Sequence, residues 1–245
     1  MPNSLANKTA LVTGGAQRLG RSLCLALAAQ GAGIVIHYNS SGNAAAELCE
    51  HLQGLGAKAW TVQADLSNPQ EAEDLIVRAL EAAGPLDLLL NNASIFDPST
   101  LGDVTFDDVT ANAAVNAWAP FVLSRHFAAQ DREGAVVNLL DSRVHGYDWQ
   151  HVAYILSKHL LHVLTRMTAL EYAPKVRVNA VAPGLILPPP GQDASYLARL
   201  APSLPLQRYG SAEDIADAAL FLLRSPFITG QVLYVDGGRH LREQT

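Results

Sequence analysis

Short runs of aliphatic residues alternate along the chain with longer stretches in which apolar residues recur every three or four positions. The short runs predict β-strands, and the longer stretches predict amphipathic helices. The strand candidates are residues 9–13, 33–38, 58–64, 86–91, 134–141, 176–182 and 231–235. The helix candidates are residues 18–30, 43–55, 69–83, 106–129, 151–172 and 212–223.

Strands that are almost continuously apolar and that alternate with helices indicate parallel pairing through helical crossovers. We therefore predict an α/β fold with a single Rossmann-type, doubly wound parallel sheet of about seven strands and helices on both faces. No repeat or linker divides residues 1–245, which predicts one domain. The longest irregular stretch, about 183–210, contains Pro188-Pro189-Pro190-Gly191 and a short helix candidate at 194–200. Loops of this length are usually functional, so we expect a substrate loop there.

The charge, the cysteine positions and the apolar runs of the chain argue against several classes of function. The formal net charge of −6 argues against a nucleic-acid partner, which would favour a basic face. Cys24 and Cys49 have no metal-ligand spacing, so we expect no metal site and two free thiols. The N-terminal residues show no secretory signal, and no apolar run approaches the roughly 20 residues of a membrane span. We expect a cytoplasmic protein without a membrane partner.

A glycine-containing turn connects the first strand candidate to the first helix candidate. Gly14 permits a tight turn, and Gly20 lets the helix pack close to the sheet. The N-terminus of that helix then offers free N–H groups to a pyrophosphate, with Arg18 beside the phosphates. The alternative is an ordinary strand-to-helix turn without a ligand.

The end of the second strand candidate bears on the choice of dinucleotide. NAD sites carry an acid about 20 residues after the glycines, where it holds the ribose 2′-OH. Here the segment reads Tyr38-Asn39-Ser40-Ser41 and has no acid, which allows a 2′-phosphate. The Asn and Ser side chains can donate hydrogen bonds to it, which favours NADPH, although a plain polar turn has the same composition.

Tyr154 and Lys158 lie four residues apart near the start of a helix candidate and so share one helix face. A free tyrosine has a pKa near 10, and a nearby ammonium lowers it. The pair can therefore exchange a proton with a substrate while a hydride moves. Asp141, at a strand end thirteen residues before Tyr154, makes the pattern more specific.

The motifs Thr13–Gly20, Asn91-Asn92-Ala93, Tyr154–Lys158, Pro183-Gly184 and Asp236-Gly237-Gly238 resemble those of the short-chain dehydrogenase/reductase family, in the family's order and over essentially the whole chain. The resemblance implies a seven-stranded sheet, a tetramer and a nicotinamide cofactor. It implies that Tyr154 is the proton donor, that Lys158 lowers its pKa and holds the nicotinamide ribose, and that Asn116 braces Lys158 through a water. The implied cofactor contacts are Gly14, Arg18, Leu19, Gly20, Tyr38, Asn39, Ser40, Ser41, Asp65 (to adenine), Leu66, Asn91, Ala93, Ser94, Tyr154, Lys158, Pro183 and Gly184.

Two positions depart from the family pattern. Arg18 replaces a glycine, and Asp141 replaces the serine that usually holds a substrate carbonyl. A carboxylate repels a developing oxyanion but accepts N–H donors, which favours a nitrogen heterocycle whose C=N bond is reduced. Asp141 could instead cap the chain as it leaves the strand.

The same departures, together with Asn91-Asn92-Ala93-Ser94-Ile95-Phe96, resemble the pteridine reductase branch, including dihydromonapterin reductases. By this resemblance Phe96 stacks on a pterin, Arg18 contacts pterin and phosphate, and Ser94 contacts a cofactor phosphate. Asp141, Tyr154 and Lys158 would together supply the proton. Phe96 could also be simple loop packing.

The leading hypothesis is an NADPH-dependent reductase that converts dihydropterins, and dihydrofolate as a secondary substrate, to the tetrahydro form. One alternative is a carbonyl reductase of the 3-oxoacyl type, and another is a dinucleotide-sensing module without turnover. An intact Tyr154/Lys158 pair argues against the sensor. Four further aromatic side chains precede Tyr154 and are left unassigned: His145, Tyr147, Trp149 and His151.

Overall fold

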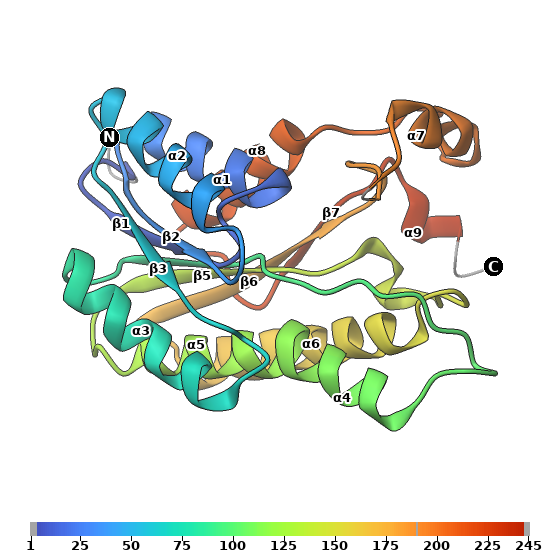
Figure 1. The fold of residues 1–245 in the computed structure, drawn as a ribbon, viewed down its shortest axis with the longest axis horizontal. Helices are drawn as coiled ribbons and strands as arrows, with labels where there is room; N and C mark the ends of the chain where they lie inside the picture. Colours follow the sequence, from blue (N-terminus) through green and yellow to red (C-terminus); the bar gives the residue numbers. More distant parts are fainter. Residues whose placement is uncertain (1–3, 190, 243–245) are drawn as a thin grey trace.

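The computed structural model describes residues 4–189 and 191–242, so Pro190 of the predicted substrate loop lies outside the described residues. Seven strands form one sheet in the order β3-β2-β1-β4-β5-β6-β7, and every neighbouring pair is parallel. This arrangement confirms the predicted doubly wound sheet (Figure 1). The strands are β1 (Thr9–Val12), β2 (Gly33–Tyr38), β3 (Ala59–Gln63), β4 (Leu88–Asn91), β5 (Gly134–Leu139), β6 (Val176–Pro183) and β7 (Val232–Val235).

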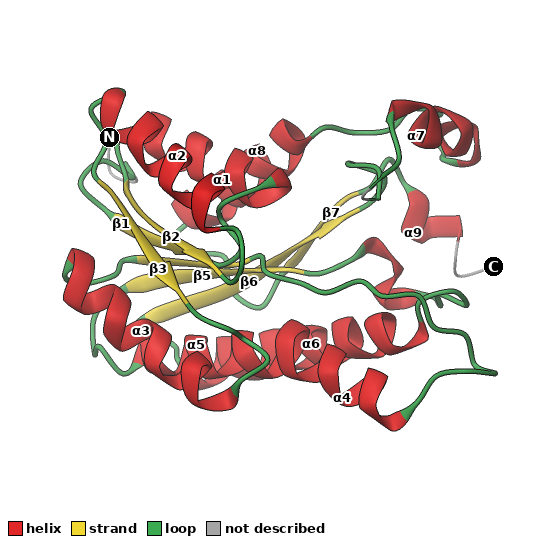
Figure 2. Ribbon diagram, in the orientation of Figure 1, coloured by secondary structure: helices red, strands yellow, loops and turns green. Residues whose placement is uncertain are grey.

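Helices cover both faces of the sheet (Figure 2). One face carries α1 (Arg18–Ala29), α2 (Gly42–Gly54) and α8 (Ala212–Arg224), and the other carries α3 (Pro69–Ala83), α5 (Ala119–Ala128) and α6 (Val152–Glu171). The remaining helical elements are α4 (Phe106–Ala113), the π-helical turn η1 (Ala114–Trp118), η2 (Ser142–His145), α7 (Ala194–Leu200), η3 (Ala201–Ser203) and α9 (Arg239–Arg242). The helix predicted at 194–200 is confirmed with the same ends.

Alternation along the strands divides the core into two layers. In β1, Ala10 and Val12 pack with the α1, α2 and α8 side, whereas Leu11 packs with the α3 and α5 side. Successive side chains of a strand point to opposite faces, so a sheet covered on both faces requires apolar residues at every position. That requirement explains why the strands read as unbroken aliphatic runs.

The single helix predicted at 106–129 is divided by η1. Backbone torsions stay helical through Ala114 and Trp118, so the chain continues through one π turn before α5. A π turn inserts one residue into the helical ladder and rotates the side chains around it, and such turns are frequent at functional sites. Here the turn contains Asn116, which is fully buried.

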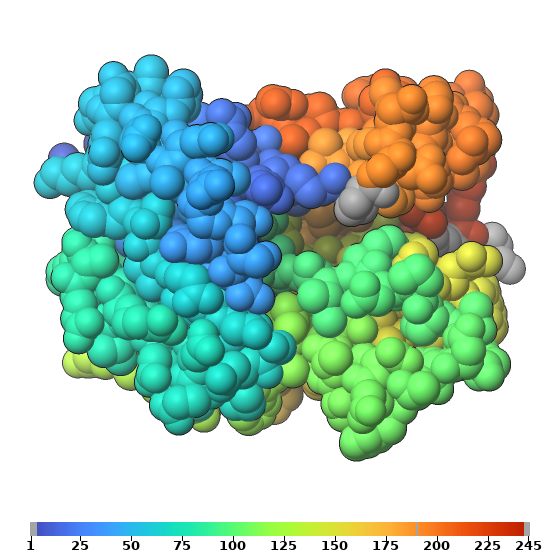
Figure 3. All heavy atoms as spheres, in the orientation of Figure 1, coloured from blue at the N-terminus to red at the C-terminus, as the bar shows by residue number. Residues whose placement is uncertain are grey.

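The strand order reverses its direction of growth between β1 and β4. The connections that leave these two strands therefore diverge to opposite faces, and a crevice forms beyond their carboxyl ends. In the space-filling view this part of the surface is hollowed between the blue N-terminal segments and the green and orange segments (Figure 3). Among the described residues, no helix is both long and apolar enough to cross a membrane.

Candidate active site

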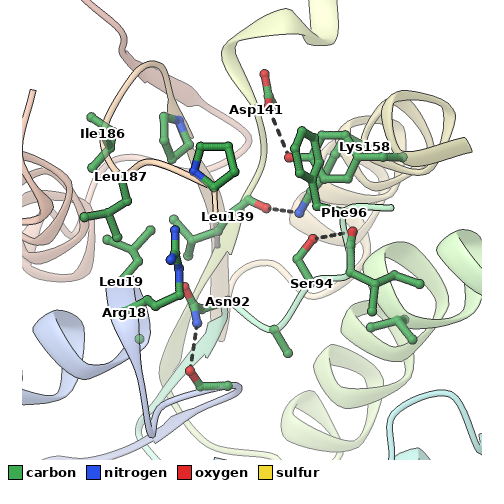
Figure 4. A pocket seen from close by; sticks show the side chains of 18 of the residues that line it. Arg18, Leu19, Asn92, Ser94, Phe96, Leu139, Asp141, Lys158, Ile186 and Leu187 are labelled. Carbon is green, nitrogen blue, oxygen red and sulfur yellow. Dashed lines mark hydrogen bonds between the residues drawn. The ribbon is translucent and has the colours of Figure 1, made fainter. Parts of the chain in front are cut away.

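A cavity of about 800 Å³ opens at the carboxyl edge of the sheet. The predicted cofactor and substrate residues gather around it, with Arg18 and Leu19 on one side and Phe96, Asp141 and Lys158 on the other (Figure 4). The predicted residues that line it are Gly14, Arg18, Leu19, Gly20, Tyr38, Asn39, Ser40, Ser41, Asp65, Leu66, Ala93, Ser94, Phe96, Asp141, Tyr154, Lys158, Pro183 and Gly184. Asn91 and Asn116 do not line it.

Tight packing of the glycine turn shapes one end of the cavity. Gly14 has a φ of +60°, which favours glycine. A Cβ on Gly20 would lie 2.0 Å from the Gly14 carbonyl oxygen, so only glycine fits there. Asn92, directly after β4, holds the turn, since its side-chain amide donates to the Thr13 carbonyl at 2.9 Å. The N-terminus of α1 is thereby brought against the cavity, as an anion site requires.

His37, at the end of β2, ties the same turn to the sheet. The Gly14 N–H donates to Nδ1 of His37 at 3.0 Å, and Nε2 lies 3.1 Å from the Ala64 carbonyl. This pair of contacts requires the neutral ring with the proton on Nε2. Burial lowers the pKa of His37 to about 4, so the neutral ring persists at neutral pH. The sequence pattern did not single out this residue.

Arg18 has a φ of +49°, in the left-handed region where this kind of turn often carries glycine. A non-glycine residue held there costs on the order of 1–3 kcal/mol, and such strain clusters at functional sites. Its guanidinium donates to the carbonyl of Pro188, in the predicted substrate loop. Arg18 therefore links the glycine turn to the substrate loop, and both lie on the same side of the cavity (Figure 4).

Asp141 follows β5 and is braced by Arg143. β5 ends at Leu139 rather than at 141, because the Asp141 side chain accepts the Arg143 N–H at 2.8 Å and caps η2. The Arg143 side chain donates Nε to Oδ1 at 3.0 Å and Nη2 to Oδ2 at 2.9 Å. Burial alone would raise the pKa of Asp141, but the Arg143 hydrogen bonds and charge outweigh it and hold the pKa below its usual range. Asp141 is therefore ionised.

The Tyr154 hydroxyl donates to Oδ2 of Asp141 at 3.1 Å, which brings the predicted catalytic groups together. The expectation that Lys158 lowers the pKa of Tyr154 is wrong for this structure. Burial, and after it the charge of Asp141, raises the pKa of Tyr154 well above its ordinary value. The Lys158 ammonium instead donates to the Leu139 carbonyl at 2.8 Å, and burial lowers its pKa to about 8. Tyr154 is thus a protonated phenol at neutral pH.

Phe96 forms the wall beside Tyr154. Its ring meets the Tyr154 ring edge-on at 4.6 Å and stacks on the His151 ring at 3.8 Å. Phe96 is 39 % exposed and lines the cavity, so it is available to a planar ligand as well as packed within the loop. The packing of Phe96 is confirmed, and its stacking on a pterin stays a prediction.

The two predicted asparagines act behind the cavity rather than in it. Asn91 is buried and donates to Oδ1 of Asn138 at 2.8 Å. Within the described residues, the hydrogen-bond partners of the Asn116 side chain do not include Lys158, so its bracing of Lys158 through a water stays a prediction. Asn116 accepts the Ser94 hydroxyl at 3.0 Å and the Ile95 N–H at 2.9 Å, and donates to the Ile95 carbonyl at 3.0 Å. Asn116 therefore positions the segment that carries Ser94 and Phe96.

The sequence pattern missed Arg143 and left His151 unassigned, yet both line the cavity. A cation two residues after a strand-end acid was the available signal for Arg143. The substrate loop and the residues after β7 add Leu185, Ile186, Leu187, Pro189, Tyr196, Leu200, Ser203, Leu204 and Arg239 to the lining. Among the described residues, no group of three or more His, Cys, Asp or Glu side chains has an arrangement that could hold a metal ion.

Comparison with known proteins places this geometry in a family. A family model described as enoyl-(acyl carrier protein) reductase matches residues 14–240. The 3β-hydroxysteroid dehydrogenase 1 of Eggerthella lenta is 34% identical, over 98% of this chain and 97% of that protein. The crystal structure of FolM alternative dihydrofolate reductase 1 from Brucella canis, complexed with NADP, is 35% identical with a TM-score of 0.91, over 99% of this chain and 98% of that one. A blue fluorescent protein from a metagenomic library, in complex with NADPH, is 33% identical with a TM-score of 0.89, over 96% of this chain and 99% of that one.

Proposed function

The chain belongs to the short-chain dehydrogenase/reductase family, and on that premise we propose that it is an NADPH-dependent reductase of pteridines. The proposed reaction converts a dihydropterin into the tetrahydropterin, with dihydrofolate as a further substrate. The resemblance to an alternative dihydrofolate reductase supports the choice of substrate.

The observation that carries this proposal is the ionised Asp141 in contact with Tyr154. Reduction of a carbonyl places negative charge on oxygen next to the proton donor, and a carboxylate there opposes it. Reduction of a C=N bond leaves a nitrogen that takes a proton and becomes an N–H donor. A nitrogen heterocycle also carries N–H groups before reduction that can donate to Oδ2 of Asp141, whereas a carbonyl group has no donor, so the carboxylate disfavours a carbonyl substrate and favours a nitrogen heterocycle.

The chain's own residues fit the dinucleotide. The close approach of Gly14 and Gly20 leaves space for a pyrophosphate at the start of α1, and NADP is bound in the Brucella canis structure. At the end of β2, Asn39, Ser40 and Ser41 line the cavity and offer neutral donors to a 2′-phosphate. When bound, NADPH supplies the hydride.

The proton comes from Tyr154. Its raised pKa keeps the phenol protonated, and the Asp141 carboxylate holds the hydroxyl in place at 3.1 Å. A ring nitrogen that has just gained electron density is a much stronger base than a phenolate, so transfer from Tyr154 is downhill. Lys158, held by the Leu139 carbonyl, lies 5.6 Å from the centre of the Tyr154 ring and places a cation beside the phenolate that forms.

Phe96 and the substrate loop complete the proposed pterin site. An aromatic face at Phe96 can stack on the planar ring system, worth on the order of 0.5–1.5 kcal/mol beyond area burial. Leu185, Ile186 and Leu187 line the same cavity and exclude water from the reacting atoms. The contact between Arg18 and Pro188 holds this loop over the glycine turn.

We further propose a homotetramer that works in the cytoplasm. The outer face of α6 exposes an apolar stripe at helical spacing, formed by Leu156, Leu160, Val163, Met167 and Leu170. A second copy of this chain would cover it. The two free cysteines suit a reducing compartment. Sedimentation of the parent and of Leu160→Glu tests the assembly, and the variant should dissociate.

The test of the function is NADPH oxidation measured in parallel with dihydromonapterin, dihydrobiopterin, dihydrofolate and an acetoacetyl thioester. The proposal expects turnover of the dihydropterins, and a preference for NADPH over NADH. Rapid reduction of the thioester with no pterin turnover would favour a carbonyl reductase of the 3-oxoacyl type. The resemblance to the granaticin polyketide synthase putative ketoacyl reductase 2 of Streptomyces violaceoruber, which is 34% identical over 95% of this chain and 96% of that protein, supports that second candidate.

A further inference from the structure

Arg143 sits at the centre of a charged network that the proposed chemistry does not itself require. Its side chain is 14% exposed, as is that of Asp141, and the side chain of Asp148 is 5% exposed. Nη2 donates to Asp141 and Nη1 donates to Asp148, so the guanidinium joins two carboxylates. A buried cation between two buried acids is costly unless each partner has a function or a tight fit.

Asp148 is itself held from two further directions. The Gln150 N–H donates to Oδ1 at 2.9 Å, and Nδ1 of His151 lies 3.0 Å from Oδ2. The His151 ring also stacks on the ring of Phe96. The chain of contacts therefore runs from Asp141 through Arg143, Asp148 and His151 to the wall of the proposed pterin site.

The two oxygens of Asp141 have different partners. Oδ1 accepts from the backbone N–H and Nε of Arg143, whereas Oδ2 accepts from both Nη2 of Arg143 and the Tyr154 hydroxyl. A guanidinium has a planar fork that fixes both oxygens of a carboxylate at once. The orientation of that fork decides that Oδ2 is the atom presented to the proton donor.

We propose that Arg143 is a positioning residue that aims Oδ2 of Asp141 at the Tyr154 hydroxyl, and that Asp148 and His151 hold Arg143 in that place. The inference rests on the proposed function for its consequence, because the carboxylate selects a C=N substrate only while it is ionised and correctly turned. Arg143 acts through Asp141, and the sequence resemblance assigned it no role.

Among the charged groups around Asp141, Arg143 is the one whose removal should change the pKa of the Asp141 carboxyl most. Tyr154 and Lys158 face it from α6 and Arg239 from α9, while Asp148, from the segment after η2, contacts Arg143. Of these groups, Arg143 donates three hydrogen bonds to the carboxylate, two from its side chain and one from its backbone N–H, and Tyr154 donates one. Removal of the Arg143 side chain takes away its charge and two of these hydrogen bonds, so burial then favours the protonated acid more strongly. The Asp141 carboxyl should then titrate at a higher pH.

The experiment is an infrared pH titration of the protonated carboxyl band in the full-length protein, with no substrate added. Subtraction of Asp141→Asn assigns the Asp141 band. In Arg143→Gln we expect the midpoint to rise by at least about one pH unit, a tenfold change in proton affinity. Arg143→Lys keeps the positive charge but lacks the planar guanidinium fork, so its midpoint should lie between those of the parent and Arg143→Gln. Asp148→Asn loosens Arg143 and should shift the midpoint in the same direction by less.

Arg125→Gln is the matched control, because Arg125 pairs with Glu73 on the exposed side of α5 at 2.7 Å and should leave the midpoint unchanged. An unchanged midpoint in Arg143→Gln, with only a lower melting temperature, would show a merely structural arginine and overturn the inference. If Arg143→Gln does not fold, Arg143→Lys and Asp148→Asn decide, and parent-like midpoints in both would overturn it.

Turnover provides a second readout. The acidic limb of the pH profile of kcat/KM should move with the infrared midpoint, measured on whichever substrate the parent reduces. Because the infrared titration needs no substrate, failure of the pterin assignment and failure of the Arg143 role are separate results. If the parent reduces only carbonyl substrates but the midpoint still shifts in Arg143→Gln, the pterin assignment is rejected and the positioning role of Arg143 is kept.

Discussion

At the end of the cavity that holds Gly14 and Gly20, backbone geometry sets the shape, whereas at the end that holds Asp141 and Tyr154 ionisable side chains set it. The first end offers N–H groups and hydroxyls that suit phosphates in any relative with the same turn. The second end has an arginine between two acids and a phenol with a raised pKa. On the proposed function, cofactor binding follows from the fold, while substrate choice depends on a few charges.

The largest expected effect comes from a substitution at the second end of the cavity that should lower turnover without weakening NADPH binding. Tyr154→Phe removes the hydroxyl that donates to Asp141 but keeps the ring that packs on Phe96. Loss of a general acid costs about 10²- to 10⁴-fold in rate. We expect turnover to fall in that range while the Kd for NADPH, measured by fluorescence titration, stays within about twofold. Parent-like turnover would remove Tyr154 from the chemistry.

The next largest effect is expected from a substitution in the glycine turn, at the first end of the cavity. A Cβ on Gly20 would lie 2.0 Å from the Gly14 oxygen, so Gly20→Ala must push the turn away from α1. We expect the Kd for NADPH to rise more than about tenfold, which corresponds to 1.4 kcal/mol. Gly54→Ala is the matched control, because nothing lies within 4 Å of its added Cβ and alanine suits a helix. Equal affinities for the two variants would contradict the proposed role of the turn.

A smaller effect concerns the histidine beneath the same turn. Burial lowers the pKa of His37 from 6.5 to about 4, so the unfolded chain binds a proton between these values and the folded chain does not. The contribution of His37 to the free energy of unfolding is therefore complete above pH 6.5 and falls by on the order of 3 kcal/mol as the pH drops towards 4.

Because glutamine cannot titrate, His37→Gln should flatten this acid dependence, although it also weakens the contact to Gly14. The measurement is urea unfolding at several pH values between 4.5 and 7 at one protein concentration. An unchanged slope of unfolding free energy against pH would show that His37 is protonated in the folded protein.

The sequence was more informative about the first end than about the second. Strand periodicity, Gly14, Gly20 and the acid-free turn after β2 are local patterns, and the structure brings them to the cavity. The Arg143–Asp148–His151 contacts depend on how η2 and the following turn fold back, which no spacing rule encodes. The π turn at Asn116 and the raised pKa of Tyr154 likewise depend on tertiary burial, which overrides the local pattern.

The central claim is that the ionised carboxylate at position 141 selects a C=N bond over a C=O bond. The most direct measurement is the ratio of kcat/KM for a dihydropterin to kcat/KM for an acetoacetyl thioester, in the parent and in Asp141→Ser. The claim predicts that the ratio falls at least about 100-fold in the variant, or about 2.7 kcal/mol of transition-state selectivity, with thioester reduction rising. A ratio that stays within about threefold of the parent's would contradict it.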